Sequence, residues 1–348
     1  TRNSEDKVTD SAAAGTAYSA GVRTYNGAIG VDAKGNAVTT VLEVAQRQGL
    51  ATGLVATSSI THATPAAFAS HVPDRSMQWE IARQLAQAEV DVMLAGGRRW
   101  FDPSQRPDSL DLLSDLKARY TYVQTSSELA ELCTGGLERL LGLFADDYLP
   151  PAPGRSPTLP AMTRAALQVL DQDPDGFFLM VEGSQPDWRG HDGEPLDAIT
   201  AEMLDLDQAV GVALDYQLRN PETLIVVTAD HETGGLAVQQ AGTRRLLTRA
   251  AATADSTLAQ LAEARSAMDP ELASLADSAS WFAGRLSRLL REKAELLGDS
   301  SILVARYTTG SHTAELVPLF ASGPGAERFG GIKENWRVGE LLREVVRR

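Results

Sequence analysis

The chain has little cysteine, no long apolar run and a shortage of basic residues. Its single cysteine, Cys133, excludes any internal disulfide and any zinc site built from cysteines, and it leaves the redox compartment undetermined. The longest apolar runs, Phe177–Val181 and Leu224–Val227, are far shorter than the roughly 18 residues that a membrane-spanning helix needs. With 32 basic and 46 acidic side chains the net charge is −14, which disfavours nucleic acids and anionic membranes as partners.

The remaining composition is that of an ordinary folded protein. Hydrophobic residues make up 43% and charged residues 22% of the 348 residues, which argues against a disordered or collagen-like chain. This length accommodates either two domains or one large α/β domain. The sequence begins with Thr1 and shows no signal peptide, so we expect a processed or trimmed chain whose targeting information is missing.

Short β-rich runs alternate with longer helical stretches. Several runs are continuously apolar, which is typical of strands buried on both faces of a parallel sheet. The alternation predicts an α/β fold with helices on both faces of a mostly parallel central sheet. The expected strands are Thr52–Ser58, Val90–Ala95, Tyr120–Gln124, Phe177–Val181, Leu224–Thr228, Ser301–Ala305 and Val317–Ala321. The expected helices are Ser11–Gly21, Val38–Gln48, Met77–Ala88, Ser126–Leu132, Ala161–Asp171, Ala198–Leu218 and Trp336–Val346.

Two segments interrupt this alternation. Residues 148–162 are rich in proline and are expected to form an extended surface loop. Residues 242–298 are rich in Ala, Leu, Arg and Glu and are expected to form a helical insertion. We therefore predict a single domain over residues 1–348 that carries these two additions.

Residue types that bind metals follow four of the expected strands. Taken singly, each acid or histidine is explained as a helix cap or a loop residue. The carboxyl ends of parallel strands meet at one edge of a sheet, however, so we expect these side chains in one place. Imidazole and carboxylate ligands suit Zn²⁺, whereas carboxylate, hydroxyl and water ligands suit Mg²⁺. The residues are His62 and Thr64 after Thr52–Ser58, Glu182, Asp187 and His191 after Phe177–Val181, Asp230 and His231 after Leu224–Thr228, and His312 after Ser301–Ala305.

Ser11 is the candidate nucleophile. It lies at or near the N-cap of an expected helix, where backbone N–H groups and the helix dipole favour an anion. Capping the helix is an alternative role for this serine. In the functional interpretation a bound Zn²⁺ lowers the pKa of the hydroxyl, which is otherwise a poor nucleophile at neutral pH. The chain has no Gly-x-Ser-x-Gly segment, so a serine-hydrolase triad is not supported.

Five segments together resemble the alkaline phosphatase family. The segment VTDSAAAGTAYSAGVRTYNGAIGVD (Val8–Asp32) resembles the family's nucleophile segment. The resemblance covers most of the chain apart from the proline-rich loop and the helical insertion, and jointly the segments are highly specific. The others are ITHATPAAFASH (Ile60–His71), VEGSQPDWRGH (Val181–His191), VTADHETGG (Val227–Gly235) and GSHTAELVPLFASGPGA (Gly310–Ala326).

The resemblance implies a three-layer α/β/α sandwich and a phosphomonoesterase that uses two zinc ions and one magnesium ion. It implies that Ser11 becomes a phosphoserine and that Arg75 clamps the phosphate bidentately. Asp10 resembles the family residue that orients this arginine, and His62 and Trp188 occupy variable positions that tune the site. The implied metal ligands are Asp187, His191 and His312 for the first zinc, Asp230 and His231 for the second zinc, and Thr64 and Glu182 for magnesium.

The resemblance also bears on substrates and location. It implies small phosphate monoesters as substrates, a periplasmic or secreted location, and a homodimer as a possible assembly. A phosphodiesterase of the same superfamily is an alternative, although such enzymes normally use Thr as the nucleophile. A sulfatase is disfavoured because no Cys/Ser-x-Pro-x-Arg segment surrounds Ser11.

Before Ser11 the sequence differs from the family pattern. Family members carry there a strand that ends in an Asp bridging the second zinc and the magnesium, and only ten residues precede Ser11 here. Asp10 matches a different family residue, and Asp6 lies too close to Ser11 to replace the missing Asp. We therefore expect this sequence to be a fragment of a longer enzyme, with weaker occupancy of the second zinc and magnesium sites. A truncated, non-catalytic phosphate-binding or metal-binding fragment is the alternative.

Overall fold

The computed structural model describes residues 2–132, 135–265, 270–297 and 301–347. They form two compact units. The main unit comprises Thr1–Gly235 and Tyr307–Arg348, and the inserted unit comprises Leu236–Arg306. The sequence was expected to form a single domain with a helical insertion, and that domain assignment stays a prediction.

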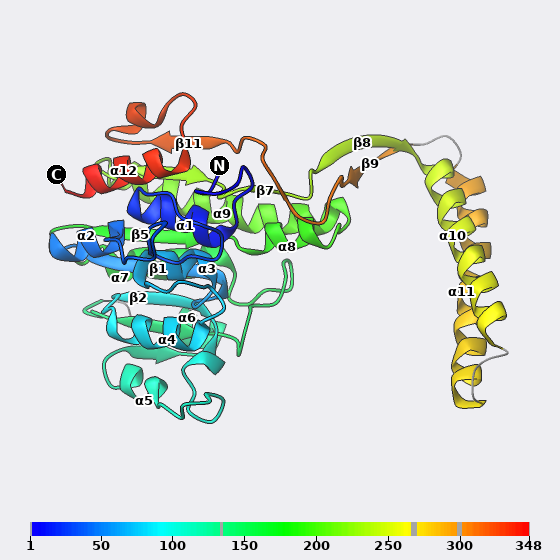
Figure 1. The fold of residues 1–348 in the computed structure, drawn as a ribbon, viewed down its shortest axis with the longest axis horizontal. Coiled ribbons are helices and arrows are strands. Elements are labelled where there is room, and N and C mark those ends of the chain that lie inside the picture. The colour runs from blue at the N-terminus through cyan, green and yellow to red at the C-terminus, as the bar shows by residue number, and fades with distance from the viewer. Residues whose placement is uncertain (1, 133–134, 266–269, 298–300, 348) are drawn as a thin grey trace. The chain divides into compact units, whose positions relative to one another are not determined.

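The main unit is built on a five-stranded sheet whose strand order is β3-β4-β2-β1-β5 (Figure 1). All neighbouring strands in this sheet are parallel, so the predicted parallel central sheet is confirmed. Four of its five strands were expected from their apolar runs, whereas β4 is a short strand that was not. The strands are β1 (Ala51–Ser59), β2 (Val92–Gly96), β3 (Thr121–Val123), β4 (Leu140–Leu143) and β5 (Phe177–Glu182).

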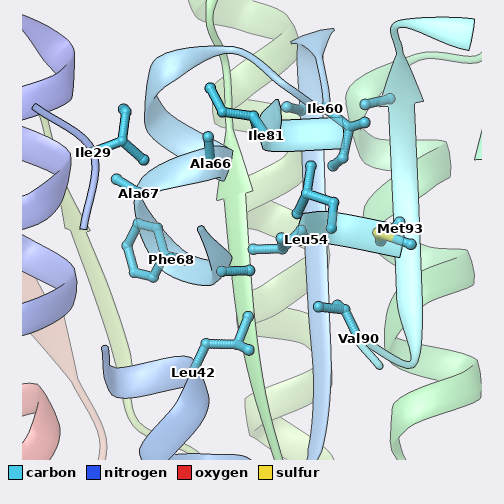
Figure 2. Packing of buried hydrophobic residues seen from close by; sticks show 14 of the residues in the cluster. Ile29, Leu42, Leu54, Ile60, Ala66, Ala67, Phe68, Ile81, Val90 and Met93 are labelled. Carbon is cyan, nitrogen blue, oxygen red and sulfur yellow. The ribbon is translucent and has the colours of Figure 1, made fainter. Parts of the chain in front are cut away.

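Side chains of the central strands alternate between two buried clusters. On β1, Leu54 belongs to one cluster and Val55 to the other, and on β2 the same holds for Met93 and Leu94. Figure 2 shows the first cluster, in which Leu54 and Met93 lie among the apolar side chains of neighbouring helices, such as Phe68. Because strand side chains point alternately to opposite faces, a layer of helices covers each face. The predicted α/β/α sandwich is therefore confirmed.

Each face of the sheet has its own set of helices. The first cluster receives residues from α1 (Ser11–Ala20), α2 (Val41–Arg47), α3 (Ala63–Ala69), α4 (Gln78–Gln87), α5 (Leu112–Lys117) and α12 (Asn335–Val346). The second cluster receives residues from α6 (Ser126–Glu131), α7 (Leu159–Leu170) and α9 (Leu196–Arg219). A short helix, α8 (Gln185–His191), follows β5.

Two antiparallel pairs complete the main unit. β6 (Ile225–Thr228) pairs with β11 (Leu319–Ser322), and β7 (Glu232–Thr233) pairs with β10 (His312–Thr313). The β7–β10 pair sets His312 opposite Thr233, two residues after His231. This pairing carries His312 toward the residues that follow β6.

The expected strand Ser301–Ala305 forms, but its predicted role was wrong. It is β9 (Ser301–Arg306), which pairs antiparallel with β8 (Ala237–Gly242) inside the inserted unit rather than joining the parallel sheet. The apolar pattern indicates an extended segment, but it does not select the partner strand. His312 therefore does not follow a strand of the central sheet, and β10 positions it instead.

Two long helices make up most of the inserted unit. They are α10 (Thr243–Ala264) and α11 (Pro270–Leu297), and they contact each other along their length. The side chains buried between them include Ala251, Ala276 and Ala294, which allow a close approach of the two backbones. None of the helices in the described part of the chain combines the length and the apolar character that a bilayer span requires.

The proline-rich segment 148–162 is only partly a surface loop. α7 begins within it at Leu159, and the side chain of Arg155 is only 1% exposed. Its guanidinium donates to Glu202 Oε2 at 2.7 Å and to Asp205 Oδ2 at 2.6 Å, both on α9. The Arg155 Nε also donates to the carbonyl of Pro150. One buried cation therefore fastens the loop to a helix of the main unit.

His71 and Glu43 form a pH-dependent link between α2 and the segment after α3. The Nε2 of His71 lies 2.9 Å from Glu43 Oε1, and its Nδ1 lies 2.7 Å from the Gly30 carbonyl. The hydrogen bond that His71 donates to Glu43 raises the pKa of His71 above its ordinary value of 6.5, against the opposing effect of burial, because both acceptors favour the protonated ring.

We expect this link to stabilise the fold mainly at acidic to neutral pH. A raised folded-state pKa contributes stability that is fully present below the unfolded-state pKa and is lost as the pH rises through the folded-state pKa. His71→Gln should therefore lower the thermal unfolding midpoint relative to wild type. The decrease should be larger at about pH 6 than at about pH 9. Thermal unfolding followed by circular dichroism measures both values, and a deficit that grows with pH would contradict the assignment.

Candidate active site

Ser11 is the first residue of α1, and its hydroxyl is not used to cap the helix. Asp10 is the N-cap, and its carboxylate accepts a hydrogen bond from the Ala13 N–H at 2.9 Å. The Ser11 Oγ instead lies 3.0 Å from the Nε2 of His231. The alternative that this serine merely caps the helix is therefore wrong, and its buried hydroxyl points at a histidine from a distant part of the chain.

Asp230 and His231 follow β6 and lie against α1. The Asp230 Oδ2 is 3.1 Å from His231 Nε2, so one imidazole nitrogen faces both the carboxylate and Ser11. Burial raises the pKa of Asp230, but the adjacent His231 more than compensates and holds it at about 2. Tyr18, on the same helix as Ser11, donates to the carbonyl of Ala229 at 3.0 Å. This bond fixes the end of β6 relative to α1.

Asp187 lies among three histidines. Its Oδ1 is 3.4 Å from His191 Nε2, 3.6 Å from His312 Nε2 and 3.9 Å from His231 Nδ1. Ligand atoms of Asp187, His231 and His312 all lie within 4.8 Å of one another. Burial raises the pKa of Asp187, but hydrogen bonds, the largest from His312, outweigh it and lower the pKa below its ordinary value. The group has the donor atoms and the spacing of a metal centre.

Backbone carbonyls orient two of these imidazoles toward the centre of the group. The Nδ1 of His191 is 2.9 Å from the Gly310 carbonyl, and the Nδ1 of His312 is 2.8 Å from the Thr9 carbonyl. Donation of Nδ1–H to a carbonyl leaves Nε2 with its lone pair, which is the form that binds metals. The two Nε2 atoms lie only 3.0 Å apart. Two lone pairs this close repel unless a cation or a proton lies between them.

Arg75 is held from two sides at the edge of the site. Its Nη1 donates to Asp10 Oδ2 at 3.1 Å, and its Nη2 donates to the Nε2 of His62 at 3.2 Å. Burial, helped by the charge of Arg75, lowers the pKa of His62 to about 4, so this ring is a neutral acceptor at neutral pH. The guanidinium therefore has a fixed orientation before any ligand arrives.

Glu182 and Thr64 form a second group of oxygen atoms. Glu182 ends β5 and accepts a hydrogen bond from Ser184 Oγ at 2.7 Å. Burial raises its pKa to about 7. The hydroxyl of Thr64 is buried without a hydrogen-bond partner in the described structure, and it interacts with Glu182. An unpartnered buried hydroxyl beside a buried carboxylate suits a hard cation such as Mg²⁺.

Trp188 lies on α8 with its ring near that of His62, at a centroid distance of 5.9 Å. The predicted site residues all lie in the main unit: Glu182 and Thr64 form one group, and direct contacts connect the others into a second group. Sequence reasoning missed three supporting groups: the hydroxyl of Thr233, which donates to Asp187; Ser184, which donates to Glu182; and Tyr148, whose ring lies beside Trp188. Thr233 and Ser184 lie within the family-like segments, so they were within reach, whereas Tyr148 lies in the proline-rich loop and gave no signal.

Comparisons with known proteins agree with this geometry. A family model described as alkaline phosphatase matches residues 1–347. The chain belongs to the alkaline phosphatase family. Alkaline phosphatase 3 of Bacillus subtilis (strain 168) is 38% identical over 368 residues, a match that covers 97% of this chain and 76% of the relative.

Solved alkaline phosphatases share the fold. The structure of the alkaline phosphatase from the Antarctic bacterium TAB5 matches with a TM-score of 0.77 at 33% identity, over 99% of this chain and 86% of that one. The Thermus thermophilus alkaline phosphatase matches with a TM-score of 0.76 at 30% identity, over 97% and 80% of the two chains. As a member of the alkaline phosphatase family, the chain is a metal-dependent hydrolase that acts on phosphate monoesters.

Proposed function

We propose that the chain hydrolyses phosphate monoesters through a phosphoserine formed on Ser11. The observation that carries this proposal is the position of the Ser11 Oγ, 3.0 Å from His231 in a group of metal-binding side chains. The Oγ attacks phosphorus, an Oγ–P bond forms, and the bond from phosphorus to the ester oxygen breaks. Water then attacks the same phosphorus, releases inorganic phosphate and restores the serine hydroxyl.

Arg75 positions the phosphoryl group during both steps. Asp10 and His62 hold its guanidinium, so two parallel N–H groups meet the phosphoryl oxygens without reorganisation. Asp10 also accepts from the backbone N–H of Gly27 at 3.0 Å, which ties the arginine clamp to the loop after α1. This network fixes the distance between the nucleophile and the group that it attacks.

The surrounding residues offer ligands for two zinc ions and one magnesium ion, but the second zinc and the magnesium lack the bridging Asp that the family resemblance implies, so we expect weaker occupancy of these two sites. Carboxylates outnumber guanidinium groups at the site, so a dianionic phosphate requires additional positive charge there. When bound, the divalent cations supply this charge, lower the pKa of the serine hydroxyl and stabilise the departing oxygen. We assign Asp187, His191 and His312 to one zinc, Asp230 and His231 to the other, and Thr64 and Glu182 to magnesium.

A solved relative supports the magnesium assignment. A mutant of the TAB5 alkaline phosphatase, which matches this chain with a TM-score of 0.78 at 33% identity, was solved with Mg bound in its M3 site. Glu182 and Thr64 offer carboxylate and hydroxyl oxygens. Such oxygens suit Mg²⁺ better than they suit Zn²⁺. A homodimer and a periplasmic or secreted location, both implied by the family resemblance, stay predictions.

Metal depletion tests the proposed function. We expect dialysis against a chelator to reduce the hydrolysis of p-nitrophenyl phosphate to below about a tenth, and Zn²⁺ with Mg²⁺ to restore it. Bis(p-nitrophenyl) phosphate serves as the control substrate, because faster hydrolysis of this diester would favour the phosphodiesterase alternative. Binding of Zn²⁺ and phosphate without any turnover would instead favour a non-catalytic module.

A further inference from the structure

A pocket of about 320 Å³ opens beside the proposed phosphate site. Two of its lining residues belong to the catalytic group: His62, which contacts Arg75, and His191, which lies near Asp187. Consider an ester whose phosphoryl group lies between Arg75 and Ser11. The rest of that ester would extend into this pocket. Tyr148 and Trp188 also line the pocket, together with Arg189 and Asp192, and their two rings form its aromatic wall.

The two aromatic rings of this wall are close to each other and to His62. The ring centroids of Tyr148 and Trp188 are 4.7 Å apart at an angle of 60°, and the Tyr148 ring is 6.3 Å from that of His62 in an edge-on arrangement. Tyr148 is 43% exposed, so part of its ring remains free to contact a ligand. This exposed part of the ring offers an apolar, flat surface inside the pocket that a ligand can bury.

The backbone around Tyr148 is fixed although it lies at the start of the proline-rich loop. Both backbone groups of the next residue are bonded: Leu149 N–H donates to Thr57 O at 3.2 Å, and Leu149 O accepts from Gln185 Nε2 at 2.8 Å. The Leu149 side chain is buried. On the other side, the Asp147 carbonyl approaches Gly96 so closely that a Cβ at this glycine would lie 2.1 Å away. Tyr148 is therefore a preorganised contact surface.

We propose that Tyr148 is a specificity residue that, with Trp188, binds an aromatic leaving group of the phosphate monoester. This inference rests on the proposed function and predicts that, among phosphate monoesters, the protein prefers aryl phosphates or phosphates of ring-bearing alcohols. Flat rings bind such walls in offset or edge-on arrangements, which add about 0.5–1.5 kcal/mol beyond simple burial.

Two non-hydrolysable inhibitors test the proposal without the effect of leaving-group reactivity. Phenylphosphonate and methylphosphonate share the anionic head and differ in the ring, so the ratio of their inhibition constants reports the ring alone. We expect Tyr148→Ala to reduce the preference for phenylphosphonate about fivefold, in line with the energy of aromatic contacts. Tyr148→Phe is the matched control, because it keeps the ring and should keep the preference.

The outcomes separate this inference from the proposed function. If Tyr148→Ala hydrolyses p-nitrophenyl phosphate but retains the wild-type preference for phenylphosphonate, the aromatic wall is wrong and the proposed function stands. If wild type hydrolyses no monoester, the proposed function fails, and calorimetric binding of the two phosphonates still tests the wall. If Tyr148→Ala merely displaced the loop, both phosphonates would bind more weakly by the same factor. The ratio of their inhibition constants would then be unchanged, and this result also overturns the proposal.

Discussion

Ser11→Ala is expected to reduce kcat for p-nitrophenyl phosphate by at least about 10⁴-fold, because it removes the hydroxyl that lies 3.0 Å from His231 and that we propose accepts the phosphoryl group. The loss should not come from unfolding. Asp10 rather than Ser11 caps α1, and alanine is a good helix former, so the helix keeps its start. The folded state and the metal-binding side chains should remain.

Ser19→Ala is the matched control for this substitution. Ser19 is also buried on α1, but its Oγ donates to the Ala67 carbonyl at 2.6 Å, away from the metal-binding group. Its removal should cost about 1 kcal/mol of stability and leave kcat near the wild-type value. Mass spectrometry of acid-quenched reactions gives a second readout, because wild type should carry phosphate on Ser11. Turnover that persists in Ser11→Ala would overturn the mechanism.

Arg155→Met is expected to destabilise the protein by about 3–5 kcal/mol. The substitution leaves Glu202 and Asp205 buried without their cation, and like charges in a medium of low dielectric constant repel strongly. The Ala152 N–H also donates to Glu202, so the loop loses its attachment when that carboxylate moves. The shift in the urea midpoint at constant m-value measures the effect.

Arg98→Met is the control for the loss of an ion pair as such. Arg98 pairs with Asp146 at 2.7 Å, but both side chains are at least a third exposed, so the cost should stay within about 1 kcal/mol. Adding Glu202→Gln and Asp205→Asn to Arg155→Met should recover part of the lost stability, because it removes the uncompensated charges. Equal destabilisation by Arg98→Met and Arg155→Met would show that the burial of the network is unimportant.

The sequence predicted the parallel central sheet, and it also named candidate site residues whose roles stay predictions. Polar residues after apolar runs indicated where the metal-binding group would form, because parallel strands deliver their carboxyl ends to one edge. Glu182 at the end of β5 shows this, whereas Asp230 and His231 follow β6, which pairs antiparallel with β11 outside the five-stranded sheet. The identity of Ser11 as nucleophile came from its resemblance to the family segment, and the capping role of Asp10 required the helix itself.

The remaining features depend on contacts between distant residues. β4 escaped prediction because a run of four residues, Leu140–Leu143, carries too little pattern to distinguish it from a buried loop. β9 showed the right propensity, but its partner β8 was decided by the chain reversal of the inserted unit. Arg155 meets Glu202 and Asp205 across 47 and 50 residues, and no local pattern encodes that distance.

The pairing of β8 with β9 makes the inserted unit modular. Ala237 pairs with Arg306, so the unit begins and ends at neighbouring points in space although 68 residues lie between them. A shorter or longer inserted segment could join the same two points. The entropic cost of closing it would change little, because this cost grows only slowly with loop length. We therefore expect the inserted unit to be replaceable, because the β7–β10 pair that sets His312 opposite Thr233 belongs to the main unit.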